Sequence, residues 1–262
     1  MKCTLKIFLS LVIISLAGCK KDDENGASAN SGNTGNTGNT GNTGNNANSS
    51  THTCGEANVH NPNITYGSVN DINGNSYKTV VIGSQNWMAE NLKTSNYRNG
   101  DAILTGLDTN DEWYETSNGA WCYYGNDPQN ACPYGKLYNW MAVEDNRGIC
   151  PTGWHVPSES EWIELVDHLG GEASALPALL SSDGGWFNGQ EFTNSSGFSG
   201  VPGGFRGAGI FDFLGEGMMS QYWTSSVSDP YYAHTISMDG ASGFENLLSL
   251  TENGCAIRCI QD

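Results

Sequence analysis

Apolar side chains are spread unevenly along the 262 residues and divide the chain into three parts. A basic start, with Lys2 and Lys6, leads into a mostly apolar run over residues 7–17, and residues 25–52 contain no apolar side chain larger than alanine. From about residue 53, apolar positions return at strand and helix spacing and continue to the end. This pattern predicts a targeting segment, a linker and one globular domain over residues 53–262.

The first apolar run ends in Leu16-Ala17-Gly18-Cys19, which has the form of a lipobox. The run is too short to span a bilayer, so it predicts a signal peptide over residues 1–18 rather than a transmembrane helix. Cleavage would leave Cys19 as a lipidated N-terminus, and the two or three acyl chains of a lipoprotein, palmitate among them, hold firmly to a membrane. Residues 20–24 resemble the acidic signal that sends Bacteroidetes lipoproteins to the outer face of the outer membrane. We therefore expect a lipid-anchored outer-membrane protein that faces the cell exterior.

The predicted linker, residues 19–52, consists mainly of Gly, Asn, Ser and Thr after its charged start. A Gly-Asn-Thr triplet begins at Gly32 and occurs four times through Thr43. A segment with so little to bury cannot offset the entropy cost of ordering, which predicts a flexible tether. The uncharged part of this tether would have a root-mean-square span of roughly 30 Å.

The charge of the chain limits its partners. Removing residues 1–18 removes two of the 11 basic side chains and leaves nine against 28 acidic ones, a net charge of −19. Nucleic acid and anionic membrane surfaces would be repelled, so neither is an expected partner. Acidic loops that bind calcium are the alternative use of this charge.

Cysteine usage indicates an oxidising compartment. Cys3 leaves with the signal peptide and Cys19 is the lipid site, which leaves Cys54, Cys122, Cys132, Cys150, Cys255 and Cys259. An even number in an exported protein predicts disulfides, with fifteen possible connectivities. A zinc site is not predicted, because the tight two-residue spacing of zinc knuckles is missing.

An Asn-Gly turn at Asp71–Asn75 precedes an alternating β-branched run at Ser76–Gly83. This arrangement predicts a hairpin turn that enters a strand. The same residues partly match a calcium loop, but the glycine falls at the fourth position and Ile82 stands where a glutamate is required. We favour the hairpin and predict no metal site and no cofactor; calcium binding lacks support.

Two helices and a later series of strands are expected in the globular domain. Ser158-Glu159-Ser160-Glu161 is a capping box, followed by an apolar face at Trp162, Leu165, Val166 and Leu169 and by Gly170-Gly171. A second helix is predicted over residues 134–143. After residue 183, short apolar pieces at 203–206, 222–226, 233–238 and 256–260 alternate with glycines, which predicts a mainly antiparallel sheet and an α+β domain.

Several motifs, taken in order, resemble the Fibrobacter succinogenes major paralogous domain family. The resemblance covers about Val69 to the end. It rests on the turn at Asp71–Asn75 and on the segments 81–92, 134–140, 150–158, 222–225 and 258–259. This family is largely uncharacterised, so the resemblance implies an exported bacterial domain and no reaction.

A weaker similarity connects Trp154–Trp162, Arg206-Gly207 and Ile257–Cys259 with the motif order of formylglycine-generating enzymes. Their C-type-lectin-like fold implies a single loop-rich, disulfide-stapled domain in which Cys150 pairs with Cys259. Under that analogy Cys122 would pair with Cys132, and Cys54 with Cys255. An enzyme on this scaffold is one alternative function.

No catalytic template is satisfied, so we predict a protein that is not an enzyme. The reactive cysteine pair of formylglycine-generating enzymes has no counterpart between Cys150 and Cys255. Gly197-Phe198-Ser199-Gly200-Val201 begins like a nucleophile elbow but has Val201 where the second glycine belongs. The five histidines show no metal-ligand spacing.

Aromatic residues in loop-like segments are the candidates for ligand binding, because aromatic faces stack on sugar rings and anchor protein partners. The candidates are Trp113, Tyr114, Trp121, Tyr123, Tyr124, Trp186, Tyr231 and Tyr232. Five other tryptophans, in the family motifs and on element faces, are assigned to the core: Trp87, Trp140, Trp154, Trp162 and Trp223. The expected function is non-catalytic binding or adhesion, with a glycan or a surface protein as ligand, and a structural role in an adhesin or surface assembly is the other alternative.

Overall fold

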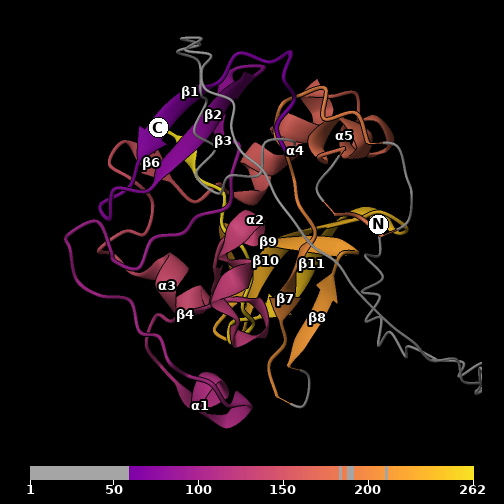
Figure 1. Cartoon of the computed structure of the whole chain (residues 1–262). Helices are drawn as coiled ribbons and strands as arrows, with labels where there is room; N and C mark the ends of the chain where they lie inside the picture. Colours follow the sequence, from indigo (N-terminus) through magenta and orange to yellow (C-terminus); the bar gives the residue numbers. More distant parts are fainter. Residues whose placement is uncertain (1–58, 183–184, 188–191, 210–211) are drawn as a thin grey trace, which may run out of the picture. The chain divides into compact units, whose positions relative to one another are not determined.

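The computed structural model describes residues 59–182, 185–187, 192–209 and 212–262, which form a mixed α+β domain (Figure 1). The predicted signal peptide, Cys19, the linker and Cys54 lie outside the described residues. The helices within these ranges are α1 (Asn110–Glu115), α2 (Ala131–Tyr134), α3 (Trp140–Glu144), α4 (Glu159–His168) and α5 (Glu172–Leu179), with 3-10 turns η1 (Tyr124–Asn126) and η2 (Pro128–Asn130). None of them is long and apolar enough to cross a bilayer.

The first sheet has five strands in the order β1-β2-β3-β12-β6. These are β1 (Gly67–Asn70), β2 (Ser76–Ile82), β3 (Gln85–Met88), β12 (Ile260–Gln261) and β6 (Trp154–His155). The predicted hairpin is present, because β1 pairs antiparallel with β2 across the turn at Asp71. Oδ1 of Asp71 accepts hydrogen bonds from the backbone N–H groups of Asn73 and Asn75, both at 2.9 Å, and Oδ2 accepts from the Tyr77 hydroxyl at 2.6 Å. Both carboxylate oxygens therefore hold the turn, which is a structural role.

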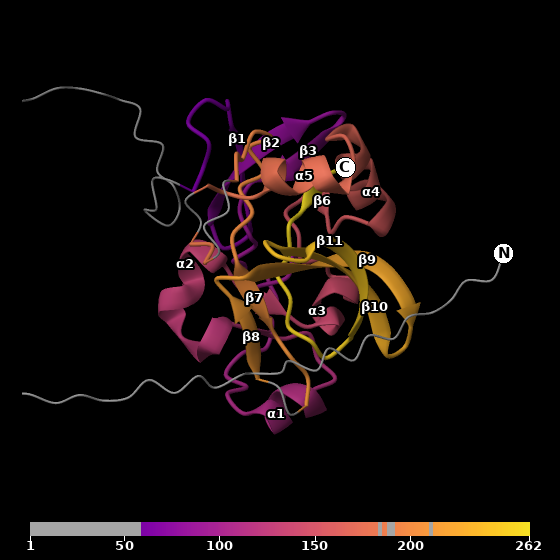
Figure 2. The same ribbon diagram turned by 90° about the vertical axis from the view of Figure 1, so that its right-hand side faces the viewer.

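The second sheet also has five strands, in the order β11-β10-β9-β7-β8. These are β11 (Gly243–Leu250), β10 (Tyr232–Asp239), β9 (Met219–Asp229), β7 (Gly203–Arg206) and β8 (Phe213–Glu216). Three of the predicted late strands correspond to β7, β9 and β10. The sheet is mainly antiparallel, as expected, but β7 runs parallel to β9. Figure 2 shows α4 and α5 between the β1–β3 strands and this second sheet.

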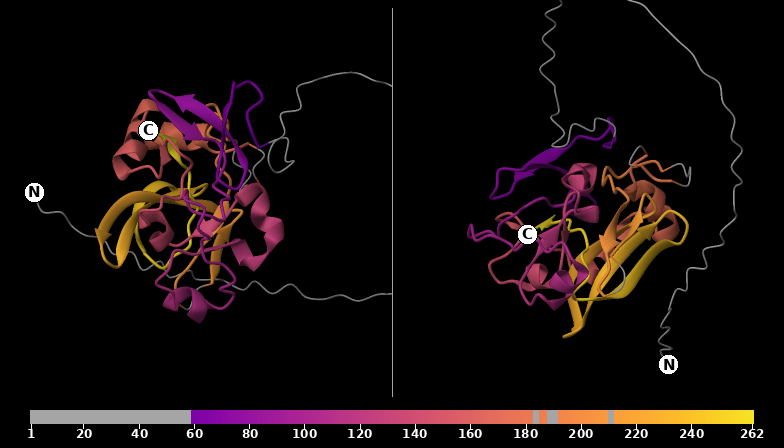
Figure 3. Two further views of the ribbon diagram at one scale, coloured as in Figure 1. Left: turned by 90° about the vertical axis from the view of Figure 1, so that its left-hand side faces the viewer. Right: turned by 60° about the horizontal axis from the view of Figure 1, so that its bottom comes forward.

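The C-terminal segment, residues 254–261, connects the two sheets (Figure 3). It forms single bridges to Arg206 and Tyr222 of the second sheet and to Tyr138, and then pairs with Trp87 and His155 through Ile260. The expected strand at 256–260 is wrong except at its last residue, because isolated bridges replace a continuous ladder. A short pair, β4 (Trp121–Cys122) and β5 (Leu137–Tyr138), completes the strands of the described ranges.

The two helix predictions had different outcomes. The capping box is confirmed: the Ser158 hydroxyl accepts from the Glu161 N–H, and the Glu161 carboxylate accepts from the Ser158 N–H, so α4 begins directly after Ser158. The helix predicted over 134–143 is wrong. Residues 137–138 pair with β4 instead, and α3 begins only after Asn139, whose side chain caps it by accepting from the Ala142 N–H. The described ranges contain five helices rather than the two expected.

Two apolar clusters form the core. The first is built around the rings of Trp87, Trp162 and Phe198, with the Trp87 and Trp162 centroids 4.7 Å apart. The second contains Trp140 and Trp223, whose ring centroids are 5.4 Å apart, and it includes both Cys150 and Cys259. The assignment of five tryptophans to the core is confirmed, since all five are buried.

Cys150 and Cys259 form a disulfide that closes a sequence separation of 109 residues. The other two expected pairings are wrong, because Cys122 and Cys255 are buried thiols. Cys122 lies on β4 beside Leu137, and Cys255 bridges Tyr138 on the other side of β5, so a strand separates the two sulfur atoms. Cys132 is disulfide-bonded.

Candidate functional site

The two most prominent aromatic candidates do not offer a ring face to a ligand. Trp113 on α1 is only 1% exposed, and the Arg206 guanidinium covers its ring at 4.6 Å. Trp121 is half-buried, and Nζ of Lys136 lies 3.4 Å from its ring centroid. Burial lowers the pKa of that lysine to about 8, and its ammonium donates to the Ser95 hydroxyl at 2.5 Å. Both tryptophans are therefore occupied by cations of the same chain.

The remaining aromatic candidates lie at separate places. Tyr123 contacts Trp121 edge-on, and Tyr124 packs on Phe213 of β8 at 5.2 Å. Trp186 is half-buried against Phe192. The exposed members are Tyr114 on α1 and Tyr231 and Tyr232 at the β9–β10 turn. The fold therefore does not gather the eight candidates into one binding face.

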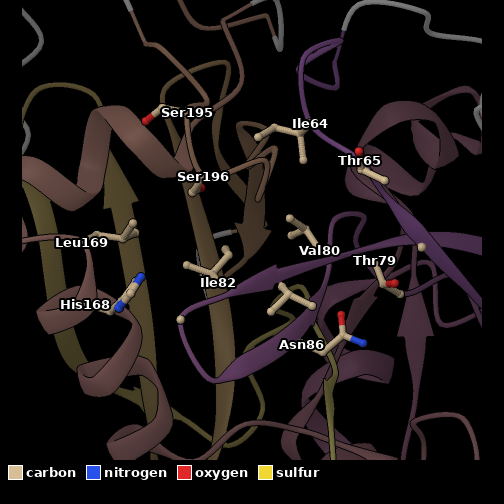
Figure 4. A pocket seen from close by; sticks show the side chains of 13 residues that line it. Ile64, Thr65, Thr79, Val80, Ile82, Asn86, His168, Leu169, Ser195 and Ser196 are labelled. Carbon is tan, nitrogen blue, oxygen red and sulfur yellow. The ribbon is translucent and has the colours of Figure 1, made fainter.

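A groove of about 540 Å³ lies between the β2–β3 hairpin, the end of α4 and the loop at 195–196 (Figure 4). Its volume falls in the range of small-ligand sites. The polar side chains that line it are Thr65, Thr79, Asn86, His168, Ser195 and Ser196. Its apolar lining consists of Ile64, Val80, Val81, Ile82 and Leu169.

Local sequence explains how these groups meet. Alternation along β2 directs Val80 and Ile82 toward the core, where both are buried and form the floor of the groove. The tight β2–β3 turn at Gly83, which has a φ of +62°, lies against the His168 imidazole; a Cβ at position 83 would be 2.9 Å from Nδ1. His168 is the last residue of α4, so the end of this helix brings the ring to the groove.

The 195–196 loop is fixed from below. The Ser196 hydroxyl donates to the Ala178 carbonyl of α5 at 2.7 Å and accepts from the Phe198 N–H at 3.2 Å. The Ser195 side chain is exposed at the rim. Across the groove, Nδ2 of Asn86 donates to Gln261, whereas its Oδ1 has no hydrogen-bond partner in the part of the chain that the structure describes. That oxygen is itself buried, so the part of Asn86 that faces the groove is not a free acceptor.

The groove carries no carboxylate, ammonium or guanidinium among its lining residues, all of which are described. On a chain with a net charge of −17, an uncharged recess with hydroxyl, amide and imidazole groups is distinctive. Such a lining can exchange hydrogen bonds with a neutral polyhydroxylated ligand while its aliphatic floor contacts the C–H face. No group of three metal-ligating side chains lies together within the described ranges.

Sequence reasoning missed this groove. Its members come from the segments 64–67, 79–86, 168–169 and 195–196, and no spacing rule connects them. The serine pair at 195–196, between the turn-forming residues Asn194 and Gly197, is the one local signal that could have indicated an exposed polar loop.

The chain belongs to the Fibrobacter succinogenes major domain family, whose match covers residues 80–261. The resemblance drawn from the motifs is therefore confirmed. No curated protein matches the chain, and no solved structure matches it. The family description names neither a ligand nor a reaction, so the groove must be interpreted from its own chemistry.

Proposed function

We propose that this protein is a lipid-anchored, surface-exposed binding module, not an enzyme, and that its groove beside His168 binds a neutral glycan. The observation that carries the proposal is the uncharged, hydrogen-bonding lining of a 540 Å³ groove on an otherwise acidic chain. Acidic polysaccharides would be repelled by the surrounding charge, whereas neutral sugars carry no such penalty.

The predicted lipobox and acidic export signal support a location on the outer face of the outer membrane, with Cys19 as the anchor. We also propose a C-type-lectin-like scaffold, which the Cys150–Cys259 disulfide and the closing C-terminal segment support. We propose that sugar binding does not use calcium. The Asp71 carboxylate, in the turn that partly matches a calcium loop, accepts hydrogen bonds from the backbone of its own turn and from the Tyr77 hydroxyl.

Binding is tested with the full chain in detergent on a panel of neutral polysaccharides, namely glucan, mannan, xylan and galactan, with polygalacturonate as the acidic comparison. Each lost neutral hydrogen bond costs about 1 kcal/mol, so His168→Ala combined with Ser195→Ala should weaken binding by roughly twentyfold or more. Calcium and chelator should give equal binding.

The matched control is Tyr231→Ala, an exposed aromatic candidate outside the groove, which should bind as the wild type does. If Tyr231→Ala abolishes binding and the groove variant does not, the site lies at the β9–β10 turn. If no polysaccharide binds, the glycan proposal is wrong, and a surface protein becomes the ligand to seek.

Membrane attachment has its own test. Cys19→Ala should move the protein from the membrane pellet to the soluble fraction. Retention of the variant in the pellet would contradict the lipid anchor.

A further inference from the structure

A serine, a histidine and a glutamate from distant parts of the chain meet in the interior. Nδ1 of His60 lies 3.0 Å from the Ser199 hydroxyl, and Nε2 of the same ring lies 3.8 Å from Oε1 of Glu90. Ser199 is fully buried, and His60 and Glu90 are 6% and 7% exposed. The hydroxyl also donates to the Gly197 carbonyl oxygen at 3.1 Å, so it must rotate toward Nδ1 of His60 before the histidine can accept its proton, as the base does in a nucleophile–base–acid relay.

The carbonyl on the other side of Ser199 is polarised. Nη1 of the buried Arg258 donates a hydrogen bond to the Phe198 carbonyl oxygen, and Nη2 donates to the Ser199 carbonyl at 2.8 Å. A cationic donor at a carbonyl oxygen stabilises the negative charge that develops there when a nucleophile attacks the carbonyl carbon. Arg258 is held in place by Asn91, whose Oδ1 accepts from Nε at 2.8 Å.

The peptide unit between Phe198 and Ser199 is also conformationally constrained. Ser199 has a φ of +60°, the left-handed region that non-glycine residues rarely adopt. Asn194 holds it there, because Oδ1 accepts from the Ser199 N–H at 2.9 Å while Nδ2 donates to the hydroxyl at 3.0 Å. Backbone strain at a buried nucleophile is a feature of reactive sites.

An external substrate cannot reach this relay. The cavity that Ser199 lines together with Glu90 and Arg258 has a volume of about 10 Å³, the size of a single water molecule. The acyl carbon that the hydroxyl attacks is therefore one of its own chain. Arg258 polarises the carbonyls of both Phe198 and Ser199, and of these two carbons the hydroxyl reaches that of Phe198 through an unstrained five-membered ring.

We propose that the protein cleaves its own backbone between Phe198 and Ser199 by an N-to-O acyl shift. The Ser199 hydroxyl oxygen forms a bond to the Phe198 carbonyl carbon, and its proton passes to His60. The carbon–nitrogen bond then breaks, and His60 returns the proton to the Ser199 nitrogen. Water hydrolyses the resulting ester, which leaves the Phe198 carboxylate and a new N-terminal Ser199.

The protonation state of His60 suits this role. Burial lowers its pKa below the usual range, and this effect outweighs the opposing influence of Glu90; Lys78 and Arg258 lower it further. The imidazole is therefore neutral at pH 7 and able to accept the serine proton. The acyl shift should be slow in acid, where the imidazole is protonated.

The two products would not separate under native conditions. Cys150 lies before the cut and Cys259 after it, so their disulfide joins the fragments. Gel electrophoresis under denaturing conditions should show one band without reductant and two bands with it. The smaller band would begin at Ser199 and contain β7 to β12.

The test is the intact mass of the reduced, denatured full chain after incubation at pH 8 with and without hydroxylamine, which attacks the ester intermediate. Without hydroxylamine we expect two fragments whose masses sum to the chain plus one water. With hydroxylamine we expect faster cleavage and a fragment ending at Phe198 as a hydroxamic acid, so that the masses sum to the chain plus one hydroxylamine. Ser199→Ala and His60→Gln should stay intact, whereas Ser199→Cys should cleave through its thiol.

The matched control is Ser220→Ala, which removes another buried serine hydroxyl, one that donates to the Val201 carbonyl, and should cleave as the wild type does. A wild-type chain that remains undivided after hydroxylamine treatment overturns the proposal. Cleavage that persists in Ser199→Ala would assign the cut to a contaminating protease and overturn it as well. Neither result depends on whether the groove binds a glycan.

Discussion

Replacing Cys150 and Cys259 together by alanine should lower the free energy of unfolding by about 5 kcal/mol. The bond closes a sequence separation of 109 residues, and the chain-entropy relation gives about 16 cal/mol/K for a loop of that length, or about 5 kcal/mol at 25 °C. Both side chains are buried, so alanine introduces no polar group into the core. The comparison is made in a Ser199→Ala background, which keeps the loop continuous.

The assay is equilibrium urea unfolding followed by tryptophan fluorescence. With a slope of about 2 kcal/mol/M, the double variant should unfold at a urea concentration about 2.5 M lower. Cys122→Ala is the control, since it removes a buried thiol without opening a loop and should shift the midpoint far less. A shift of less than about 0.5 M for the double variant would refute the loop-closure reasoning.

Three further predictions concern local structure. Ser158→Ala removes the cap of α4 and should lower the free energy of unfolding by about 1 kcal/mol, measured by thermal unfolding. Ser160→Ala, two residues further along, should lower it much less. Partial burial lowers the pKa of His155, but hydrogen bonds to Asp262 and Glu161 raise it overall, so its stabilising contribution is fully present below pH 6.5 and lost as the pH rises through the folded-state pKa. His155→Gln should therefore have a lower melting temperature than the wild type at pH 6 and a similar one at high pH. An equal difference in melting temperature at low and high pH would contradict this assignment. Gly204→Ala places a Cβ 2.3 Å from the Leu214 carbonyl oxygen at a φ of +61° and should disrupt the β7–β8 pairing, whereas Gly209→Ala, which meets no atom within 4 Å, shares only the backbone strain and should destabilise the chain less.

The elements that the sequence predicts correctly are those encoded by neighbouring residues. The Asp71 turn and the Ser158 capping box consist of side chains that bond to backbone groups two to four residues away, so their structure follows from local sequence. The failed helix over 134–143 shows the opposite case. Its periodicity is helical, but Leu137 and Tyr138 gain cross-strand partners from β4, and tertiary pairing overrides the local preference.

Composition misdirected the search for the binding site for a physical reason. Aromatic residues in loop-like segments look exposed in a sequence. In the fold, however, Arg206 covers Trp113, which is distant in the chain, and Lys136 covers Trp121. Cation–aromatic contacts of this kind leave no periodic trace. The groove at His168 and the relay at Ser199 likewise unite residues more than a hundred positions apart, which a single sequence does not reveal.

Residues 254–261 make the two sheets depend on one another for stability. Ile260 is the residue that joins β3 to β6, and Gly254 and Ala256 bridge the second sheet a few residues earlier. Deleting residues 254–261 would leave β3 and β6 without the strand that joins them and Cys150 without Cys259, so it should unfold the domain rather than trim it.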